Sequence, residues 1–124
     1  MPDAILIVRR DDELLWAMRD ALELEGYDVH VAADAAAAMS VLAGGLHPRA
    51  ILMDAESVDA AAGEALGMAA DGAPCLVTTW DARATAPRGA RVLRQPFLLA
   101  ELRAALAEMA DAPRSGGPRR AGSG

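Results

Sequence analysis

The residues Ala50-Ile51-Leu52-Met53-Asp54 decide how this chain folds. Four apolar residues in a row are typical of a strand that is buried on both faces of a parallel sheet. The aspartate stands where that strand should end. Ligands and chemistry gather at the carboxyl ends of the strands in open parallel sheets. We therefore take Asp54 as the candidate centre of a functional site.

Strand-like and helix-like patterns alternate on either side of this stretch. The other expected strands are residues 4–8, 28–32, 75–79 and 90–94. The expected helices run from a cap at Asp11 or Asp12 to about 25, and over 35–43, 60–70 and 98–109. Residues 80–89 leave room for little more than one helical turn before Pro87. Such alternation predicts an α/β sandwich with helices on both faces of the sheet.

The length of 124 residues suits a single domain. We expect this domain to cover residues 1–110. Residues 111–124 are rich in Pro, Gly, Ser and Arg, so they predict a disordered C-terminal tail. The tail carries three Arg and one Asp, which leaves a net charge of −8 on residues 1–110.

Composition excludes several classes of partner. The net charge of −6 and the pI of about 4.8 argue against nucleic acid and against an anionic membrane surface. Neither a signal peptide nor a membrane span is visible, so we expect a cytoplasmic protein. The single cysteine, Cys75, is expected to be a small buried hydrophobe. All twelve basic residues are Arg, and the chain has no Lys.

Short motifs recur along the chain at the spacing of one protein family. They are the apolar strand Ile5–Val8, Gly26-Tyr27, Leu52-Met53-Asp54, Val77-Thr78-Thr79 and Gln95-Pro96-Phe97. Over residues 4–110 the chain resembles the receiver domains of bacterial response regulators. The resemblance implies a three-layer flavodoxin-like sandwich with a five-stranded parallel sheet in the order 2-1-3-4-5, here with the third and fourth helices shortened. It also implies a place in two-component or phosphorelay signal transduction.

In that family, the phosphohistidine of a kinase donates its phosphoryl group to the aspartate that corresponds to Asp54. Mg²⁺ bridges this aspartate, an acidic pair after the first strand and the phosphate. A lysine pairs with the phosphate, a threonine hydroxyl bonds it, and an aromatic residue then turns inward. A carboxylate is a weak nucleophile that needs a metal to neutralise phosphate oxygens, and Mg²⁺ prefers hard oxygen ligands.

The acidic-pair positions hold Arg9 and Arg10. A guanidinium has five donors and no acceptor, so it cannot ligate a metal. Asp11 and Asp12 follow directly, but sliding them into these positions would drive both arginines into the buried strand and break the register of the later motifs. We therefore predict that Mg²⁺ binding is lost and that the chain uses no other cofactor.

Three further positions depart from the family pattern. Gln95 stands in place of the lysine, and Val92 occupies the position of the aromatic switch. Trp80 replaces the small residue that normally follows the threonine, where its ring would crowd the mouth of the site. Asp54 and Thr79 are retained. The Thr79 hydroxyl has two alternatives: it takes part in the site, or it bonds the backbone nearby.

The arginine pair indicates what has replaced the metal. Successive side chains of an extended chain point to opposite faces, so at most one of Arg9 and Arg10 should meet Asp54; the sequence does not decide which. Our hypothesis is a degenerate receiver, a pseudo-receiver, without Mg²⁺-dependent phosphorylation. The alternative is a receiver in which the arginines bind the phosphoryl group directly, so that Asp54 accepts phosphate from a histidine kinase or phosphotransfer protein at a metal-independent site.

The function expected from these features is that of an interaction module and not of an enzyme. We assign no catalytic residue, and neither a G-x-G-x-x-G nor a Walker pattern is present. A stand-alone receiver must act by protein–protein contact, with a signalling protein such as a histidine kinase or phosphotransfer protein; a homodimer is left open. A small flavodoxin-like enzyme or binding protein is the third alternative, and no cofactor motif supports it.

Two further features have alternative interpretations. Trp16 lies off the apolar stripe of the first helix, so it is either a contact patch or packed against the chain termini. The Gln95-Pro96 bond is expected to be cis by analogy with the family.

Overall fold

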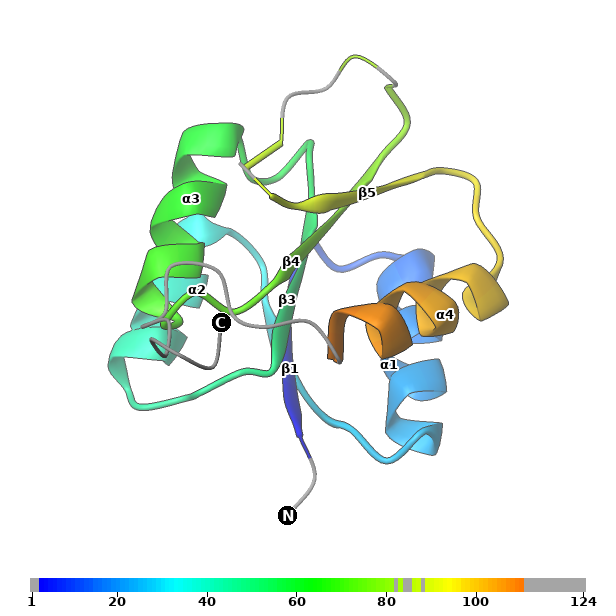
Figure 1. Cartoon of the computed structure of the whole chain (residues 1–124), viewed down its shortest axis with the longest axis horizontal. Helices are drawn as coiled ribbons and strands as arrows, with labels where there is room; N and C mark the ends of the chain where they lie inside the picture. Colours follow the sequence, from blue (N-terminus) through cyan, green and yellow to red (C-terminus); the bar gives the residue numbers. More distant parts are fainter. Residues whose placement is uncertain (1–2, 82, 84–85, 88, 111–124) are drawn as a thin grey trace, which may run out of the picture.

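The computed structural model of the chain describes residues 3–81, 83, 86–87 and 89–110. Five parallel strands form one sheet in the order β2-β1-β3-β4-β5, as predicted (Figure 1). The strands are β1 (Ala4–Val8), β2 (Asp28–Ala32), β3 (Ala50–Asp54), β4 (Cys75–Thr79) and β5 (Arg91–Arg94). β3 lies in the middle and is buried along its whole length, which is why its sequence is a continuous apolar run.

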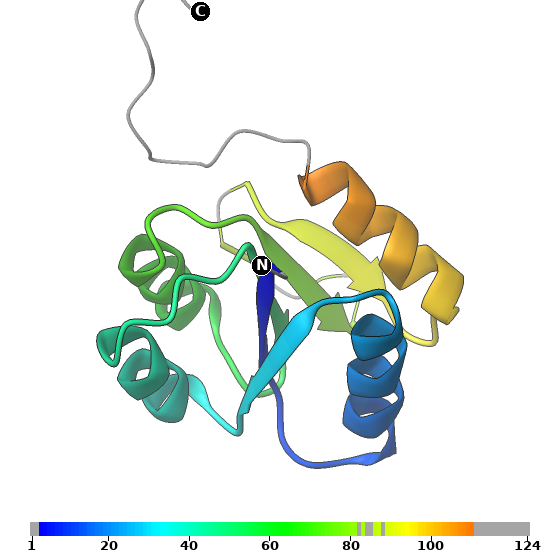
Figure 2. The ribbon, with the colours of Figure 1, turned by 90° about the horizontal axis from the view of Figure 1, so that it is seen from below.

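Within the described part of the chain, two helices cover each face of the sheet. The helices are α1 (Glu13–Leu24), α2 (Ala35–Ala43), α3 (Ala60–Ala69) and α4 (Leu99–Ala110). α1 and α4 lie side by side on one face, and α2 and α3 lie on the other (Figures 1 and 2). None of these helices is long and apolar enough to cross a membrane. The three-layer α/β sandwich is therefore confirmed.

Three helices begin at an aspartate cap. The side chains of Asp12, Asp34 and Asp59 each accept a hydrogen bond of 2.8 Å from the backbone N–H three residues further on. This bond satisfies one of the N–H groups that the first turn of a helix leaves without a partner. The sequence had left Asp11 and Asp12 open as the cap of α1, and the structure selects Asp12.

The expected shortened fourth helix is absent from the described residues between β4 and β5, so the label α4 belongs to the last helix. Only eleven residues, 80–90, connect these two strands. A parallel crossover that contains a helix needs a dozen or more residues. The expected disordered tail, residues 111–124, lies outside the described residues.

Alternating side chains of the central strands build two separate cores. On the side of α1 and α4 the strands contribute Ile5, Ile7, Ala50, Leu52 and Leu76. On the side of α2 and α3 they contribute Leu6, Val8, Ile51, Met53, Cys75 and Val77. Burial raises the pKa of the Cys75 thiol to about 11, so this residue packs as a hydrophobe. The alternation continues to the strand ends and decides which polar side chains meet there.

The connection between β4 and β5 packs closely against α3. Pro87 is buried, and a β-carbon on Gly63 would lie 2.5 Å from Pro87 Cγ and 3.0 Å from Met53 Sδ. Glycine at position 63 therefore lets the connection rest directly on the helix. The second glycine of α3, Gly67, has no such neighbour, because a β-carbon there would lie 3.7 Å from Cys75 Sγ.

These two glycines form a matched pair for mutagenesis. Gly63→Ala should lower the free energy of unfolding by about 2 kcal/mol, because the proline ring cannot yield without moving the backbone. Gly67→Ala should raise it by roughly 0.5 kcal/mol, because alanine favours the helix and fits the available space. Urea denaturation of both variants measures the difference. Equal effects at the two positions would contradict the close packing of Pro87.

Candidate functional site

Asp54 is the last residue of β3 and is 2% exposed. Its backbone carbonyl accepts hydrogen bonds from the N–H groups of Ser57 (2.9 Å) and Val58 (3.0 Å). The Ser57 hydroxyl also donates to Asp54 Oδ2 at 3.2 Å. The loop after β3 thus turns back over the aspartate and fixes one of its two carboxylate oxygens.

Arg9 brings a positive charge to the other oxygen. Its Nη1 lies 3.5 Å from Asp54 Oδ1 and 3.4 Å from Thr78 Oγ1, to which it donates a hydrogen bond. The contact with Asp54 is an ion pair longer than an ordinary hydrogen bond, and Oδ1 has no hydrogen-bond donor among the described residues. Because Arg9 is only 6% exposed, solvent screens this attraction much less than at the surface.

Asp12 holds the guanidinium from the opposite side. Arg9 Nε donates to Asp12 Oδ1 at 3.1 Å, and Nη2 donates to Oδ2 at 2.9 Å, which is the bidentate geometry of strong arginine–carboxylate pairs. The hydrogen bonds from Arg9 lower the pKa of the Asp12 carboxyl; burial opposes this effect, and the backbone N–H of Leu15 adds to it. One side chain therefore caps α1 and fixes the arginine.

Arg10 points to a different partner. Its guanidinium lies 3.6 Å from Glu56, and both side chains are largely exposed. An exposed pair of this kind contributes little to stability. The sequence had predicted that at most one of the two arginines meets Asp54, and in the structure that residue is Arg9.

The alternating directions of side chains along the strands explain why Arg9, and not Arg10, meets Asp54. β1 and β3 pair with Val8 opposite Met53, and β3 and β4 pair with Asp54 opposite Thr78. Arg9 therefore follows β1 at the level of Asp54, and the side chains of Arg9, Asp54 and Thr78 all lie on the side of α1 and α4.

Thr79 does not reach Asp54. Its hydroxyl accepts a hydrogen bond from Asp81 N (3.0 Å) and donates to Asp81 O (3.2 Å), so it stabilises the loop after β4, as the backbone-bonding alternative has it. Thr78 takes its place beside Arg9. The sequence analysis missed Thr78, although counting every second residue from the buried Leu76 would have found it.

The remaining predicted site residues lie further along the same edge. Gln95 is 7% exposed and its N–H donates to Thr79 O at 2.7 Å, while its side-chain Oε1 has no hydrogen-bond partner among the described residues. The Gln95-Pro96 bond is cis, as family analogy implied. Trp80 and Val92 are 55% and 50% exposed, and neither contributes to the pairing of Asp54.

The donor set of this site does not suit a magnesium ion. Within the described residues, no group of three or more His, Cys, Asp or Glu side chains is placed to hold a metal. The buried carboxylate of Asp54 and the partly exposed one of Asp12 both face the Arg9 guanidinium, which has no lone pair to offer a cation.

Comparison with known proteins places the architecture. No protein-family model and no curated protein matches the sequence. Among solved structures, a CheY-like response regulator receiver domain protein from Methanospirillum hungatei has a TM-score of 0.76 and 22% identity, over 90% of this chain and 95% of that chain. A putative response regulator from Chloroflexus aurantiacus has a TM-score of 0.75 and 23% identity, over 90% and 100%.

The chain has the fold of a response-regulator receiver domain. A third receiver domain, from a sensor histidine kinase of Pseudomonas aeruginosa, has a TM-score of 0.75 and 21% identity, over 90% of this chain and all of that domain. That domain coordinates a magnesium ion in its active-site cleft. The receiver fold is thus shared across nearly the whole chain.

Substitution of Arg9 tests how much the Arg9–Asp54 ion pair contributes to the stability of the fold. Arg9→Met should lower the free energy of unfolding by about 3 kcal/mol, because it leaves the Asp54 charge buried without a partner. Arg10→Met should change it by less than about 0.5 kcal/mol, because its partner is exposed. Adding Asp54→Asn to Arg9→Met should recover part of the loss, since a neutral amide needs no counter-charge. No recovery in urea denaturation would point to packing instead of charge.

Acid should weaken the same network through Asp12. Its pKa is lower in the folded protein, so its contribution to stability is present above the ordinary pKa of about 3.9 and is lost as pH falls through the folded value. Asn caps a helix nearly as well as Asp, so Asp34→Asn should be almost neutral, whereas Asp12→Asn should destabilise the protein at pH 7. Asp12→Asn should also flatten the acid limb of the curve of unfolding free energy against pH. An unchanged acid limb would rule out Asp12 as its source.

Proposed function

We propose that this chain is an atypical receiver that acts in two-component or phosphorelay signalling by protein–protein contact, without Mg²⁺-dependent phosphorylation of Asp54. The observation that carries the proposal is the buried Arg9 guanidinium, which lies between Asp12 and Asp54 at the carboxyl edge of the sheet. It provides, as part of the chain, a positive charge beside the carboxylate.

The charge balance supports this proposal. Magnesium-dependent phosphotransfer to a carboxylate needs oxygen ligands that hold the ion and a positive charge that meets the incoming phosphate. Here the single positive charge of Arg9 is shared between the carboxylates of Asp12 and Asp54, so none is left over for an incoming phosphate, and the lysine position holds the uncharged Gln95. A carboxylate oxygen held in such an ion pair is less available as a nucleophile.

One observation favours the alternative of metal-independent phosphorylation. Asp54 Oδ1 has no hydrogen-bond donor among the described residues, and Arg9 Nη1 lies only 3.5 Å away. A guanidinium binds phosphate oxygens well, so Arg9 could turn from the carboxylate to a phosphoryl group on it. In this alternative the ion pair is the resting state of a switch.

The contact surface of such a module is altered where the crossover is short. No described helix covers the outer part of β5, and Val92 is half exposed there. Leu98, which precedes α4, is also exposed. We propose that a cytoplasmic signalling protein, such as a histidine kinase or phosphotransfer protein, or a second copy of the chain contacts this altered face. We assign the chain no enzymatic activity.

The proposal is tested by incubating the protein with acetyl phosphate, with and without Mg²⁺, and measuring its intact mass. We expect no adduct at Asp54 in either condition. A stoichiometric adduct that requires Mg²⁺ and is lost in Asp54→Asn would overturn the proposal. An adduct of the same kind that forms equally without Mg²⁺ would establish the metal-independent alternative.

A variant designed to regain Mg²⁺ binding tests the same proposal from the opposite direction. Replacing both arginines in Arg9→Asp/Arg10→Asp restores two carboxylates at the acidic-pair positions. Mg²⁺ should then raise the melting temperature of this variant and leave that of the wild type unchanged, because binding to the folded state stabilises it. A wild type that Mg²⁺ stabilises as strongly as the variant would show that Arg9 does not exclude the ion.

A further inference from the structure

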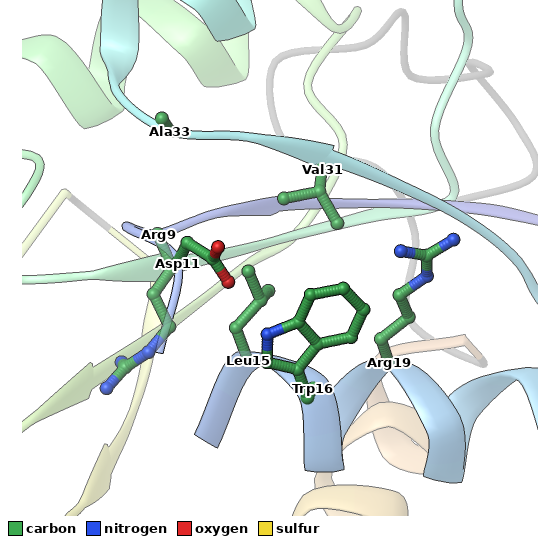
Figure 3. A pocket seen from close by; sticks show the side chains of 7 residues that line it. All are labelled: Arg9, Asp11, Leu15, Trp16, Arg19, Val31 and Ala33. Carbon is green, nitrogen blue, oxygen red and sulfur yellow. The ribbon is translucent and has the colours of Figure 1, made fainter. Parts of the chain in front are cut away.

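A surface pocket of about 190 Å³ lies beside the site, between the start of α1 and the end of β2. We call it the Trp16 pocket. Its lining residues are Arg9, Asp11, Leu15, Trp16, Arg19, Val31 and Ala33 (Figure 3). Trp16 and Val31 remain 51% and 37% exposed, so the pocket presents apolar surface to solvent that this fold leaves uncovered.

The two arginines of the pocket already have partners. Arg19 stands over the Trp16 ring, with its guanidinium carbon 5.7 Å from the ring centre, and its Nε lies 3.6 Å from Glu23. The guanidinium of Arg9 turns out of the pocket towards Asp12 and Asp54 (Figure 3). Neither cation is therefore left to bind an incoming acidic group.

Asp11 carries the remaining charge. Its carboxylate is exposed, points into the pocket towards Leu15 and Trp16, and has no ion pair or hydrogen bond of its side chain among the described residues (Figure 3). The pocket thus joins an unpaired negative charge to an indole ring. A guanidinium suits both, because it pairs with carboxylates and stacks on aromatic rings.

The chain carries such groups in the segment that follows α4. Residues 111–124 contain Arg114, Arg119 and Arg120 and have a net charge of +2, against −8 for residues 1–110. α4 ends at Ala110, on the face of the sheet that it shares with α1 (Figures 1 and 2). The segment is therefore tethered to a domain of opposite charge and starts on the face that carries the pocket.

The length of the segment selects the arginine pair at 119–120. Arg103 of α4 lies 3.5 Å from Glu25 at the end of α1, and the pocket lies at the other end of that helix. α1 has 12 residues and so is about 18 Å long. Ala110 lies seven residues beyond Arg103, up to about 10 Å further along α4. Arg119 lies nine residues beyond Ala110, a stretch that spans up to about 30 Å when extended and so reaches the pocket only when it is nearly straight. Arg114, four residues beyond Ala110, spans only about half that distance.

We propose that the segment around Arg119-Arg120 docks in the Trp16 pocket of its own chain, with a guanidinium between the Asp11 carboxylate and the Trp16 ring. A short segment without an apolar pattern binds weakly as a free peptide. Tethering raises its effective concentration above that of a free peptide, so weak contacts contribute to occupancy. The docked segment covers the start of α1 next to the Arg9 pair, and it leaves Asp54 itself untouched. This inference stands whether or not Asp54 is phosphorylated.

Fluorescence quenching by acrylamide, a neutral quencher, tests this docking in the full chain. Trp80→Phe leaves Trp16 as the single tryptophan, and Trp16→Phe leaves Trp80, whose exposure in the domain is nearly the same. At low salt, Arg119→Ser/Arg120→Ser should increase the quenching constant of Trp16 roughly twofold, because the docked segment no longer shields the ring. The quenching constant of Trp80 should not change. Asp11→Asn and high salt should each produce the same increase at Trp16.

Three results would overturn the proposal. The first is a quenching constant for Trp16 that the arginine substitutions do not change. The second is an equal change at Trp80, which would indicate a general effect of charge. The third is shielding of Trp16 that grows with protein concentration, which would assign the pocket to a second copy. If Trp80→Phe does not fold, the two indole N–H signals of the wild-type chain in NMR report on the same question, because the substitutions at 119 and 120 should shift that of Trp16 alone.

Discussion

A buried guanidinium must be surrounded by partners, and this constraint on Arg9 organises the functional edge of the molecule. Isolated buried charges cost far more than the net stability of a domain of this size. Asp12, Asp54 and Thr78 supply the partners from the N-cap of α1, the end of β3 and the end of β4. Three elements that are distant in the sequence are thereby fixed relative to one another, and Asp12 does this while it caps a helix.

The bounds of most helices and strands could be predicted from the sequence, because the buried face of each element sets the spacing of its apolar residues. The strand 50–54 and the helix 35–43 have the predicted ends, and the helix expected over 60–70 ends one residue earlier. The described residues between β4 and β5 form no helix, in keeping with a connection of residues 80–90 that is short for a helical crossover. The packing of Pro87 against Gly63 is a contact between distant residues that no local pattern indicates.

The contacts of the site were harder to predict, because they depend on which side of the sheet a side chain leaves. Arg9 and Arg10 are adjacent residues of the same type. Because successive side chains point to opposite sides of an extended chain, Arg9 is buried and Arg10 is exposed to solvent. The side chains of Thr78 and Thr79 likewise point to opposite faces of the sheet. The motif comparison selected Thr79, whereas the pleat places Thr78 on the face that Arg9 occupies. Alternation counted from a buried neighbour is thus a better guide at a strand end than the identity of the residue.

A cation that belongs to the chain has a different consequence from a cation that binds from solution. A metal ion can leave or change its ligands, so that the charge beside a carboxylate is variable. Arg9 is joined to β1 by one peptide bond, and its N–H bonds Ala32 O at 2.9 Å, so its charge stays at the site under all conditions in which the protein is folded. Under the proposed function, a domain of this design has no exchangeable cation at Asp54 on which a second state could depend. Under that proposal, the states of the domain differ at surfaces such as the outer part of β5, which no described helix covers, and the Trp16 pocket, where another segment or protein can be present or absent.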